Sequence, residues 1–433
     1  MARKFLTLII VTAFSAQAFG QNVNKLISQK YVTDVISTLA SNDMRGRETF
    51  TPDIERAARY IESEFKKIGL KPMKGDDGYR QNFTLTRVIP LKATVTLNGK
   101  TLSGDSSFAI CTLPSMNWNN DSDIQVARIS AGQDFRAEYR KYAFSNKKTL
   151  VLVDPKFEAY FKLLSDRYTK PSIKPKNSGE RQVVFVMGNF PDVKSIQASY
   201  ESRTEESPLF NVVGVLPGKS KRNEYVIFSG HYDHLGILTP VKGDSIANGA
   251  DDDASGTTAV ITLAKYFKKL HNNARTLIFA AFTAEEKGEY GSQHFAQTVE
   301  PDKVVAMFNI EMIGKPSKWG QNSAFITGYE RSDFGKILQK NLEGTDFKFY
   351  PDPYPSQDLF YRSDNASLAR VGVPAHTIST DQIDIDKLYH TVGDEVSTLD
   401  MANITSAIRA IALSSRTIVN GTDTPTRVAK LER

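Results

Sequence analysis

Three short stretches decide the fold: YVIFSGHYDHLG (residues 225–236), NGADDDASG (248–256) and TLIFAAFTAEE (276–286). The first and the third begin with an apolar run of strand length, and each run leads into polar and charged residues. Between them, Ser255 to Leu270 has the length and the apolar spacing of a helix. Strand, helix and strand in this order are typical of a sheet covered by helices.

The same alternation continues along the chain. Further strands are expected at Val212–Leu216, Val304–Ile310 and Ala324–Ile326, and helices near 332–342 and at Ala407–Val419. The pattern predicts an α/β fold with a mixed, mostly parallel central sheet flanked by helices. Functional residues of such sheets gather at the carboxyl ends of strands.

The segment before this alternation is predicted to be helical at 30–41 and 52–68. In the second stretch, apolar residues recur at helical spacing and mark one buried face. Thr51 is a suitable N-cap before Pro52, and Gly69 is a suitable stop.

Residues 86–205 have a different sequence pattern, with short strand-like runs, and are expected to form a smaller β-rich module inserted into the main domain. Asn98-Gly99, between two short strand-like runs, predicts a hairpin with a type I′ turn. Further strands are expected at Thr149–Val153 and Gln182–Met187. The main domain would then comprise residues 21–85 and 206–433.

Residues 1–20 have the pattern of a signal peptide. Arg3 and Lys4 form a positive n-region, Phe5–Phe14 is apolar, and Ala16-Gln17-Ala18 offers small residues at a suitable spacing for cleavage, after the second of these alanines or after Gly20. The apolar run has about half the length of a membrane-spanning helix. The sequence therefore predicts an exported protein, periplasmic or secreted, with no membrane anchor in its mature form.

Composition excludes several other classes. With 433 residues, 40% of them apolar, the chain can bury a sizeable core, and it is neither collagen-like nor disordered throughout. Lys and Arg outnumber Asp and Glu by only 55 to 49, without a dense basic stripe, so no nucleic-acid partner is expected. A single cysteine, Cys111, excludes an intramolecular disulfide and a cysteine-rich metal site.

Histidines and carboxylates follow the predicted strands. Each has an ordinary explanation by itself; adjacent aspartates at the start of a helix, for example, suit the helix dipole. Together they supply the ligands of a two-zinc site, in which one carboxylate bridges the metals and each metal also has a histidine and a further carboxylate. One glutamate remains as a base. The residues concerned are His231, Asp233, Asp251, Asp252, Asp253, Glu285, Glu286, Glu311 and His390.

In their order and spacing these motifs resemble the two-zinc exopeptidase family of secreted bacterial aminopeptidases. Relatives of this family include glutamate carboxypeptidase and the catalytically inert transferrin receptor. The resemblance begins near residue 30, with MRGR (44–47) and IGL (68–70), and resumes from Asn211 to around residue 420. It implies the zinc exopeptidase fold, with an insert of the protease-associated kind at 86–205.

The resemblance also implies a ligand set for two Zn²⁺ ions per chain, with Mn²⁺ or Co²⁺ as substitutes. His231 and Glu311 would bind the first zinc, Glu286 and His390 the second, and Asp252 would bridge both. The family commonly has Asp where this chain has Glu311, which keeps the carboxylate and adds a methylene group.

Two further roles follow from the resemblance. Glu285 would be the general base for a water that bridges the two zinc ions, and Asp233 would orient the His231 ring from behind. Some relatives have a non-proline cis peptide after the bridging aspartate, so one is expected at Asp252–Asp253. His234 is expected to be structural or to support a ligand. Tyr389 could line the site or donate to the oxyanion.

The predicted function is that of an exported metallo-aminopeptidase acting on peptides. Alternatives on the same architecture are a carboxypeptidase or dipeptidase, since fold and metals do not decide which terminus is held, and a one-zinc glutaminyl cyclase. A non-catalytic binding ectodomain is the alternative from another class. Such a protein would lose metal ligands, whereas this chain retains candidates for all five.

Overall fold

The structure is a computed structural model that describes residues 23–173 and 179–431. The predicted signal peptide lies outside the described residues. The chain divides into two compact units, one formed by the residues up to Phe83 and from Leu209 onward, the other by Thr84–Pro208. The larger unit contains the predicted strand–helix–strand pattern and every candidate site residue.

The larger unit is built on a central sheet with the strand order β17-β16-β18-β15-β11-β14-β10. Strands β14, β11, β15 and β18 are parallel neighbours, β10 joins β14 in antiparallel orientation, and β16 joins β18 in the same way. This confirms the predicted mixed, mostly parallel sheet. The strands are β1 (Lys71–Pro72), β10 (Ile196–Leu216), β11 (Lys221–His231), β14 (Arg275–Phe282), β15 (Val304–Ile310), β16 (Ser323–Ile326), β17 (Lys348–Pro351) and β18 (Ala375–Ser379), with a separate hairpin of β12 (Gly236–Val241) and β13 (Asp244–Ala247).

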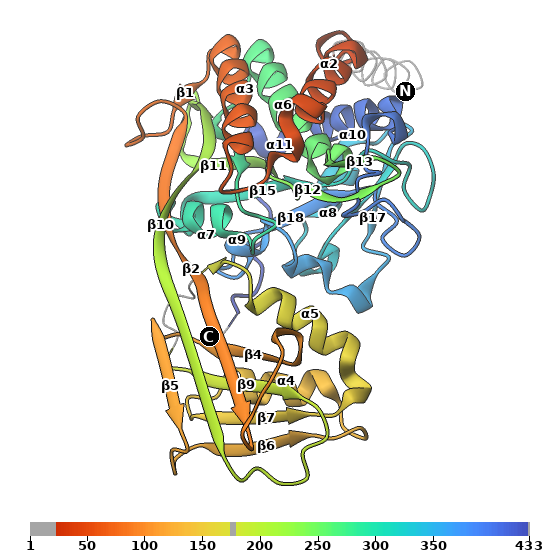
Figure 1. The fold of residues 1–433 in the computed structure, drawn as a ribbon. Helices are drawn as coiled ribbons and strands as arrows, with labels where there is room; N and C mark the ends of the chain where they lie inside the picture. Colours follow the sequence, from red (N-terminus) through yellow and green to blue (C-terminus); the bar gives the residue numbers. More distant parts are fainter. Residues whose placement is uncertain (1–22, 174–178, 432–433) are drawn as a thin grey trace, which may run out of the picture. The chain divides into compact units, whose positions relative to one another are not determined.

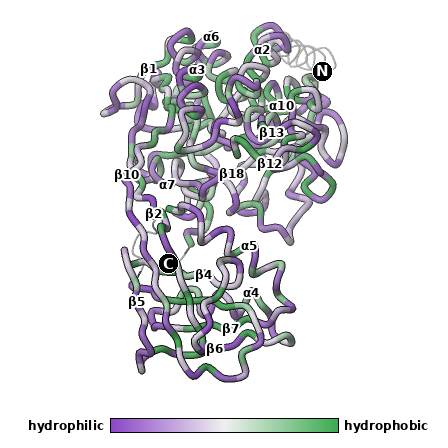
Figure 2. The backbone as a smooth tube through the Cα atoms, in the orientation of Figure 1, coloured by the Kyte–Doolittle hydropathy of each residue, from purple (hydrophilic) through white to green (hydrophobic). Residues whose placement is uncertain are grey.

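Helices cover both faces of this sheet (Figure 1). In helices such as α2 and α3, hydrophobic and hydrophilic residues alternate along the chain, as expected of amphipathic helices (Figure 2). Alternate residues of a strand face opposite sides of the sheet. Phe228 lies on one side, here called the first face, and Ile227 lies on the other, the second face. The first face carries α2 (Gln29–Leu39), α3 (Pro52–Ile68), α6 (Gly256–Leu270), α8 (Phe334–Asn341), α10 (Met401–Ser414) and α11 (Arg416–Val419), and the second carries α7 (Tyr290–Thr298) and α9 (Ala366–Ala369).

Local signals in the sequence place several element ends correctly. The Thr51 hydroxyl accepts a hydrogen bond from the backbone N–H of Asp53, and Gly69 ends α3 with a φ of 79°. Helix α6 begins one residue after the predicted start. The last helical stretch differs from the prediction. Helix α10 begins earlier than predicted, and the helix is interrupted at Ser415 before α11 begins.

The smaller unit has three layers. A four-stranded sheet with the order β4-β9-β7-β6 packs with one face on helices α4 and α5 and with the other on parts of β2, β5 and β10. Asn98 and Gly99 both have positive φ, as a type I′ hairpin requires. Helices α4 and α5 were not predicted from the sequence. The elements are β2 (Arg80–Leu97), β3 (Lys100–Thr101), β4 (Ser107–Cys111), β5 (Ser115–Asn119), β6 (Gln125–Ile129), α4 (Phe135–Ala143), β7 (Thr149–Val153), α5 (Glu158–Tyr168), β8 (Ser172–Ile173) and β9 (Gln182–Met187).

No helix among the described residues is both long and apolar enough to cross a membrane.

Candidate metal centre

The candidate site lies where the parallel strands end. His231 is the last residue of β11, Glu311 directly follows β15, and Glu285 and Glu286 follow β14. Because these strands are parallel neighbours, their carboxyl ends bring the side chains to one edge of the sheet. Asp252 reaches the same edge from the π-helical turn Ala250–Ser255 that leads into α6.

Helix α6 comes close enough to this edge because its first residue is glycine. A Cβ atom on Gly256 would overlap the carbonyl oxygen of Ile310, the last residue of β15. The small residue therefore allows the turn with Asp252 to approach the end of β15.

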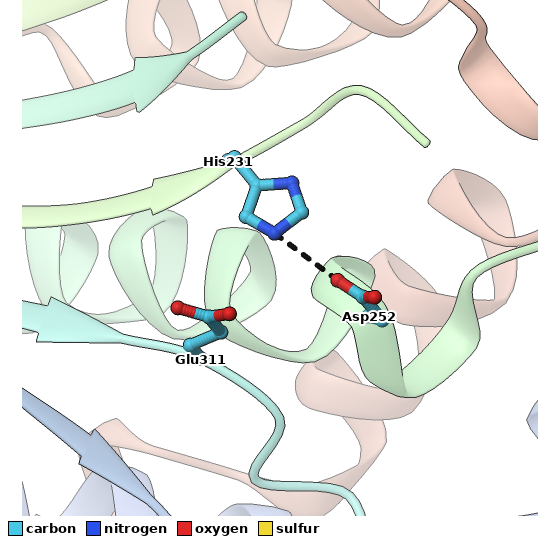
Figure 3. Close-up of side chains that lie close together, drawn as sticks. All are labelled: His231, Asp252 and Glu311. Atoms are coloured by element: carbon cyan, nitrogen blue, oxygen red, sulfur yellow. Dashed lines mark ion pairs between the residues drawn. The ribbon is translucent and has the colours of Figure 1, made fainter. Parts of the chain in front are cut away.

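One group of possible ligands consists of His231, Asp252 and Glu311 (Figure 3). His231 Nε2 lies 3.1 Å from Asp252 Oδ1, and one ligand atom from each of the three residues lies within 4.8 Å of the others. Figure 3 shows that the imidazole and the two carboxylates approach one another from β11, the turn before α6 and the end of β15. Despite its additional methylene group, Glu311 thus lies within reach of a common ion.

A second group forms around the other oxygen of Asp252. His390 Nε2 lies 3.2 Å from Asp252 Oδ2 and 3.2 Å from Glu286 Oε2. His234 Nδ1 lies 2.8 Å from Glu286 Oε1, and His234, Asp252 and Glu286 offer ligand atoms that all lie within 4.8 Å of one another. Since its two oxygens face different histidines, Asp252 has the geometry of a bridging ligand. The structure thus brings together the five residues predicted to bind metal.

The three consecutive aspartates point in three directions. Asp253 accepts backbone N–H bonds from His231, Gly256 and Met312, and so connects β11, α6 and the segment after β15. Asp251 accepts from Gly314 N–H and lies 3.3 Å from Lys315 Nζ. Only the middle carboxylate faces the histidines.

The backbone of this turn is fixed from the opposite side. The predicted cis peptide bond at Asp252–Asp253 is confirmed. The carboxylate of Asp394 accepts the N–H groups of Asp251 and Asp252 at 2.9 Å and 3.0 Å. Asp394, which has no signal in the sequence, therefore holds Asp252 through its main chain.

Asp233 lies beside the His231 ring, and its main-chain carbonyl oxygen is nearer to the ring than its carboxylate. His231 Nδ1 lies 3.1 Å from the main-chain carbonyl oxygen of Asp233 and 3.8 Å from its carboxylate, so the carbonyl orients the ring. The carboxylate instead accepts the backbone N–H of Glu285 at 3.1 Å and the hydroxyl of Thr49 at 2.8 Å. Asp233 thereby positions the predicted base as well as the predicted ligand.

Arg47 joins the loops that carry these residues. Its fully buried guanidinium donates to the carbonyl oxygens of Leu39, Tyr232, Asn248 and Gly249. The MRGR motif was part of the family resemblance, but no pattern in the sequence indicates which carbonyls an arginine reaches.

The electrostatics of the site favour positive charge. Burial lowers the pKa of His390, but its hydrogen bonds with Asp252 and Glu286 outweigh burial and raise the pKa to about 10. Burial also lowers the pKa of His231, yet the surrounding carboxylates, Glu285 first, hold it well above its usual range. Both shifts show that the carboxylates at this edge stabilise a cation.

The donor set also fits zinc. Mixed imidazole and carboxylate ligands are those that catalytic zinc sites use. His231 Nε2 and Glu311 Oε2 are buried and have no hydrogen-bond partner among the described residues. Unpaired polar atoms of this kind are costly in a protein interior, and a bound cation would satisfy both.

A small cavity of about 70 Å³ adjoins the first group. Tyr389, whose ring stacks on His390 at 3.8 Å between centroids, forms part of its wall, together with Glu311. The other lining residues are mostly apolar or uncharged, with one arginine and one aspartate: Met312, Phe325, Thr327, Leu359, Arg362, Ser363, Thr377, Ser379, Asp381 and Ile383.

The candidate ligands lie in a segment of the chain that matches a known protein family. Residues 211–414, which include every candidate ligand, match peptidase family M28. The match agrees with the family resemblance that the motifs carry.

Relatives of the M28 segment are named as aminopeptidases and metalloproteases. The chain is 27% identical to leucine aminopeptidase 1 of Ajellomyces capsulatus, over 61% of this chain and 71% of that protein. It is 30% identical to a probable leucine aminopeptidase of Arthroderma otae, over 47% and 55%. A probable zinc metalloprotease of Pyrenophora teres f. teres is 38% identical over 24% and 22%.

Solved structures share the fold. An aminopeptidase from Aneurinibacillus sp. strain AM-1 superposes with a TM-score of 0.59 at 16% identity, covering 95% of this chain and 97% of its own. A zinc aminopeptidase from Bacillus subtilis superposes with a TM-score of 0.57 at 16% identity, covering 91% and 95%. At 16% identity, these superpositions show that the chain shares the fold of the two aminopeptidases.

Proposed function

We propose that this chain is an exported aminopeptidase that hydrolyses peptides with two zinc ions. The observation that carries the proposal is the bridging geometry of Asp252, whose two carboxylate oxygens face His231 and His390 at 3.1 Å and 3.2 Å. Export rests on the signal peptide predicted from the sequence.

Five residues would hold the metal pair: His231 and Glu311 on one side, Glu286 and His390 on the other, and Asp252 between them. Two zinc ions bound by these residues would supply the Lewis acidity needed to activate water and to polarise the scissile carbonyl group. The chain's own residues have to position these ligands, move a proton and hold the substrate.

Glu285 is the group that would move the proton. Burial, with further contributions from Glu311 and Asp364, raises the pKa of its carboxyl group well above the usual range, although His231 opposes the shift. A carboxylate with a raised pKa is a stronger base, and it can pass the proton on to the leaving amine. The hydrogen bond from its backbone N–H to Asp233 fixes its place beside the metal ligands.

The cavity beside Glu311 would receive the side chain of the N-terminal residue. Its walls include Met312, Phe325, Leu359 and Ile383, which favour apolar side chains. The names of relatives such as leucine aminopeptidase 1 and a probable leucine aminopeptidase support this preference.

A substrate panel tests the proposal: leucyl, lysyl and glutamyl anilides, an N-acetylated peptide and a C-amidated peptide, with and without a chelator. We expect chelator-sensitive cleavage of substrates with a free amine, fastest for leucine. Glu285→Gln should lower kcat by about 10²- to 10⁴-fold, whereas Glu300→Gln, at an exposed side chain, should not. Cleavage confined to free-carboxylate substrates would indicate a carboxypeptidase instead.

A further inference from the structure

The side chain of Glu286 is held between two histidines. His234, in the loop between β11 and β12, is fully buried, and its Nδ1 lies 2.8 Å from Glu286 Oε1. His390 Nε2 lies 3.2 Å from the other oxygen, Oε2. Each carboxylate oxygen thus has an imidazole partner, and only one of the two histidines belongs to the proposed ligand set.

We propose that His234 is a positioning residue that donates its Nδ1–H to Glu286 and so aims the other carboxylate oxygen at the second metal. The inference rests on the proposed function, because it assigns His234 a task in the two-metal centre. A ligand carboxylate that is itself hydrogen-bonded loses less freedom when it binds a metal.

The contacts of the ring favour a donor over an additional metal ligand. His234 Nε2 is buried and has no hydrogen-bond partner among the described residues. If Nδ1 bound metal, the proton of the neutral ring would be on Nε2, as a buried N–H without an acceptor. If Nδ1 carries the proton, Nε2 is only an unpaired acceptor. Buried N–H groups without partners are rarer in proteins than incompletely satisfied acceptors.

Distances to the bridging residue agree with this choice. His234 Nδ1 lies 3.9 Å from Asp252 Oδ2, whereas His390 Nε2 lies 3.2 Å from the same oxygen. His390 is therefore closer to the point that Asp252 and Glu286 share, although His234 also offers a nitrogen within 4.8 Å of ligand atoms of both residues.

The ring of His234 is held in place independently of any metal. Its backbone N–H donates to the carbonyl oxygen of Arg47 at 3.2 Å. The ring also packs on Gly249, where a Cβ atom would collide with Cγ and Cδ2 of the imidazole. A donor fixed by backbone and packing can orient its partner before the metal binds.

Two substitutions separate the possible roles. In His234→Asn the side-chain amide keeps an N–H near the position of Nδ1 but is a poor zinc ligand. In His234→Leu the size is similar and the donor is lost. His271→Asn, at the exposed C-cap of α6 where φ is 49°, serves as a control outside the site.

Zinc binding to the apoproteins would be measured by competition with a chromogenic chelator, together with zinc per chain and the thermal midpoint without metal. We expect His234→Leu to weaken the second zinc by about 10- to 100-fold. The first zinc should be unchanged, and His234→Asn should bind both ions nearly as the wild type does. A second zinc bound by His234→Leu with wild-type affinity would overturn the inference.

Equal losses in His234→Asn and His234→Leu would overturn it in favour of a direct ligand. If His234→Leu does not fold, as the metal-free thermal midpoint would reveal, His234→Asn still separates donor from ligand. Failure of the proposed function would look different, because the wild-type protein itself would then bind fewer than two zinc ions or hydrolyse none of the substrates.

Discussion

Asp252 turns one carboxylate oxygen toward His231 and the other toward His390. Its neighbours Asp251 and Asp253 have the same side chain but bind backbone N–H groups and Lys315 instead. The sequence shows three acidic residues at the start of a helix and, by the family resemblance, singles out the middle one. The directions themselves depend on the π-helical turn, which no local sequence rule predicts.

Glu311 provides a test of a single ligand. Glu311→Gln keeps the shape and removes the charge, so the affinity for the first zinc should fall by about 100-fold or more, because zinc prefers anionic oxygen ligands. Glu311→Asp introduces the residue expected from the family resemblance and retains a carboxylate. This variant should still bind two zinc ions, with about tenfold weaker affinity for the first. Calorimetric zinc titration of the apoproteins measures both values. Unchanged affinity in Glu311→Gln would remove this residue from the ligand set.

At the scale of elements, Arg47 connects α2 to the loops after β11 and β13. Arg47→Met would remove a donor from four carbonyl oxygens, of which only that of Gly249 keeps another donor among the described residues, the N–H of Ala254. We expect a loss of about 3 kcal/mol or more in the free energy of unfolding, since an unpaired buried group costs its full desolvation. Urea unfolding of the chelated protein measures it. Arg59→Met, at an exposed arginine, is the control and should change stability by less than about 1 kcal/mol.

Because His376 in β18 is buried, we expect the free energy of unfolding to depend on pH. Burial lowers its pKa to about 4, and the ring is held neutral between the Thr327 carbonyl and the Ser332 hydroxyl. Between about pH 6.5 and pH 4 the unfolded chain binds this proton and the folded chain does not. The stability that depends on a neutral His376 is therefore complete above pH 6.5 and falls as the pH drops toward 4, by a total on the order of 3 kcal/mol.

The measurement is urea unfolding of the chelated protein at neutral pH and near pH 4. The wild type should lose on the order of 3 kcal/mol more than His376→Gln over this range, because glutamine does not titrate. Carboxylates that titrate in the same range affect both proteins alike. Equal losses would show that His376 does not carry the acid sensitivity.

At the scale of the whole molecule, the sequence predicts the elements well because periodicity, caps and turns are local signals. The strand Val304–Ile310 and the hairpin at Asn98-Gly99 are found as predicted. Five ligand candidates follow from strand ends and from the family resemblance. His234 was expected to be structural or to support a ligand, but its partner Glu286 was not predicted. Arg47 and Asp394 were given no role, because their partners are distant in sequence and only the folded chain brings them together.

The smaller unit illustrates another limit. Residues 86–205 were predicted to form a β-rich module. In the structure the smaller unit comprises Thr84–Pro208, and two helices, α4 and α5, pack on its four-stranded sheet. Short helices between strands have little sequence signal beyond their caps, such as Asp134, which accepts the N–H of Ala137. The relation of this unit to protease-associated modules stays a prediction.

The most direct test of the two-metal account is to add zinc stepwise to the apoprotein and to measure bound zinc and leucyl-anilide hydrolysis in the same samples. We predict saturation at two zinc ions per chain, with activity that requires both sites to be filled. Saturation at one ion with full activity, or hydrolysis that persists in the metal-free protein, would contradict the bridging role of Asp252 and with it the proposed mechanism.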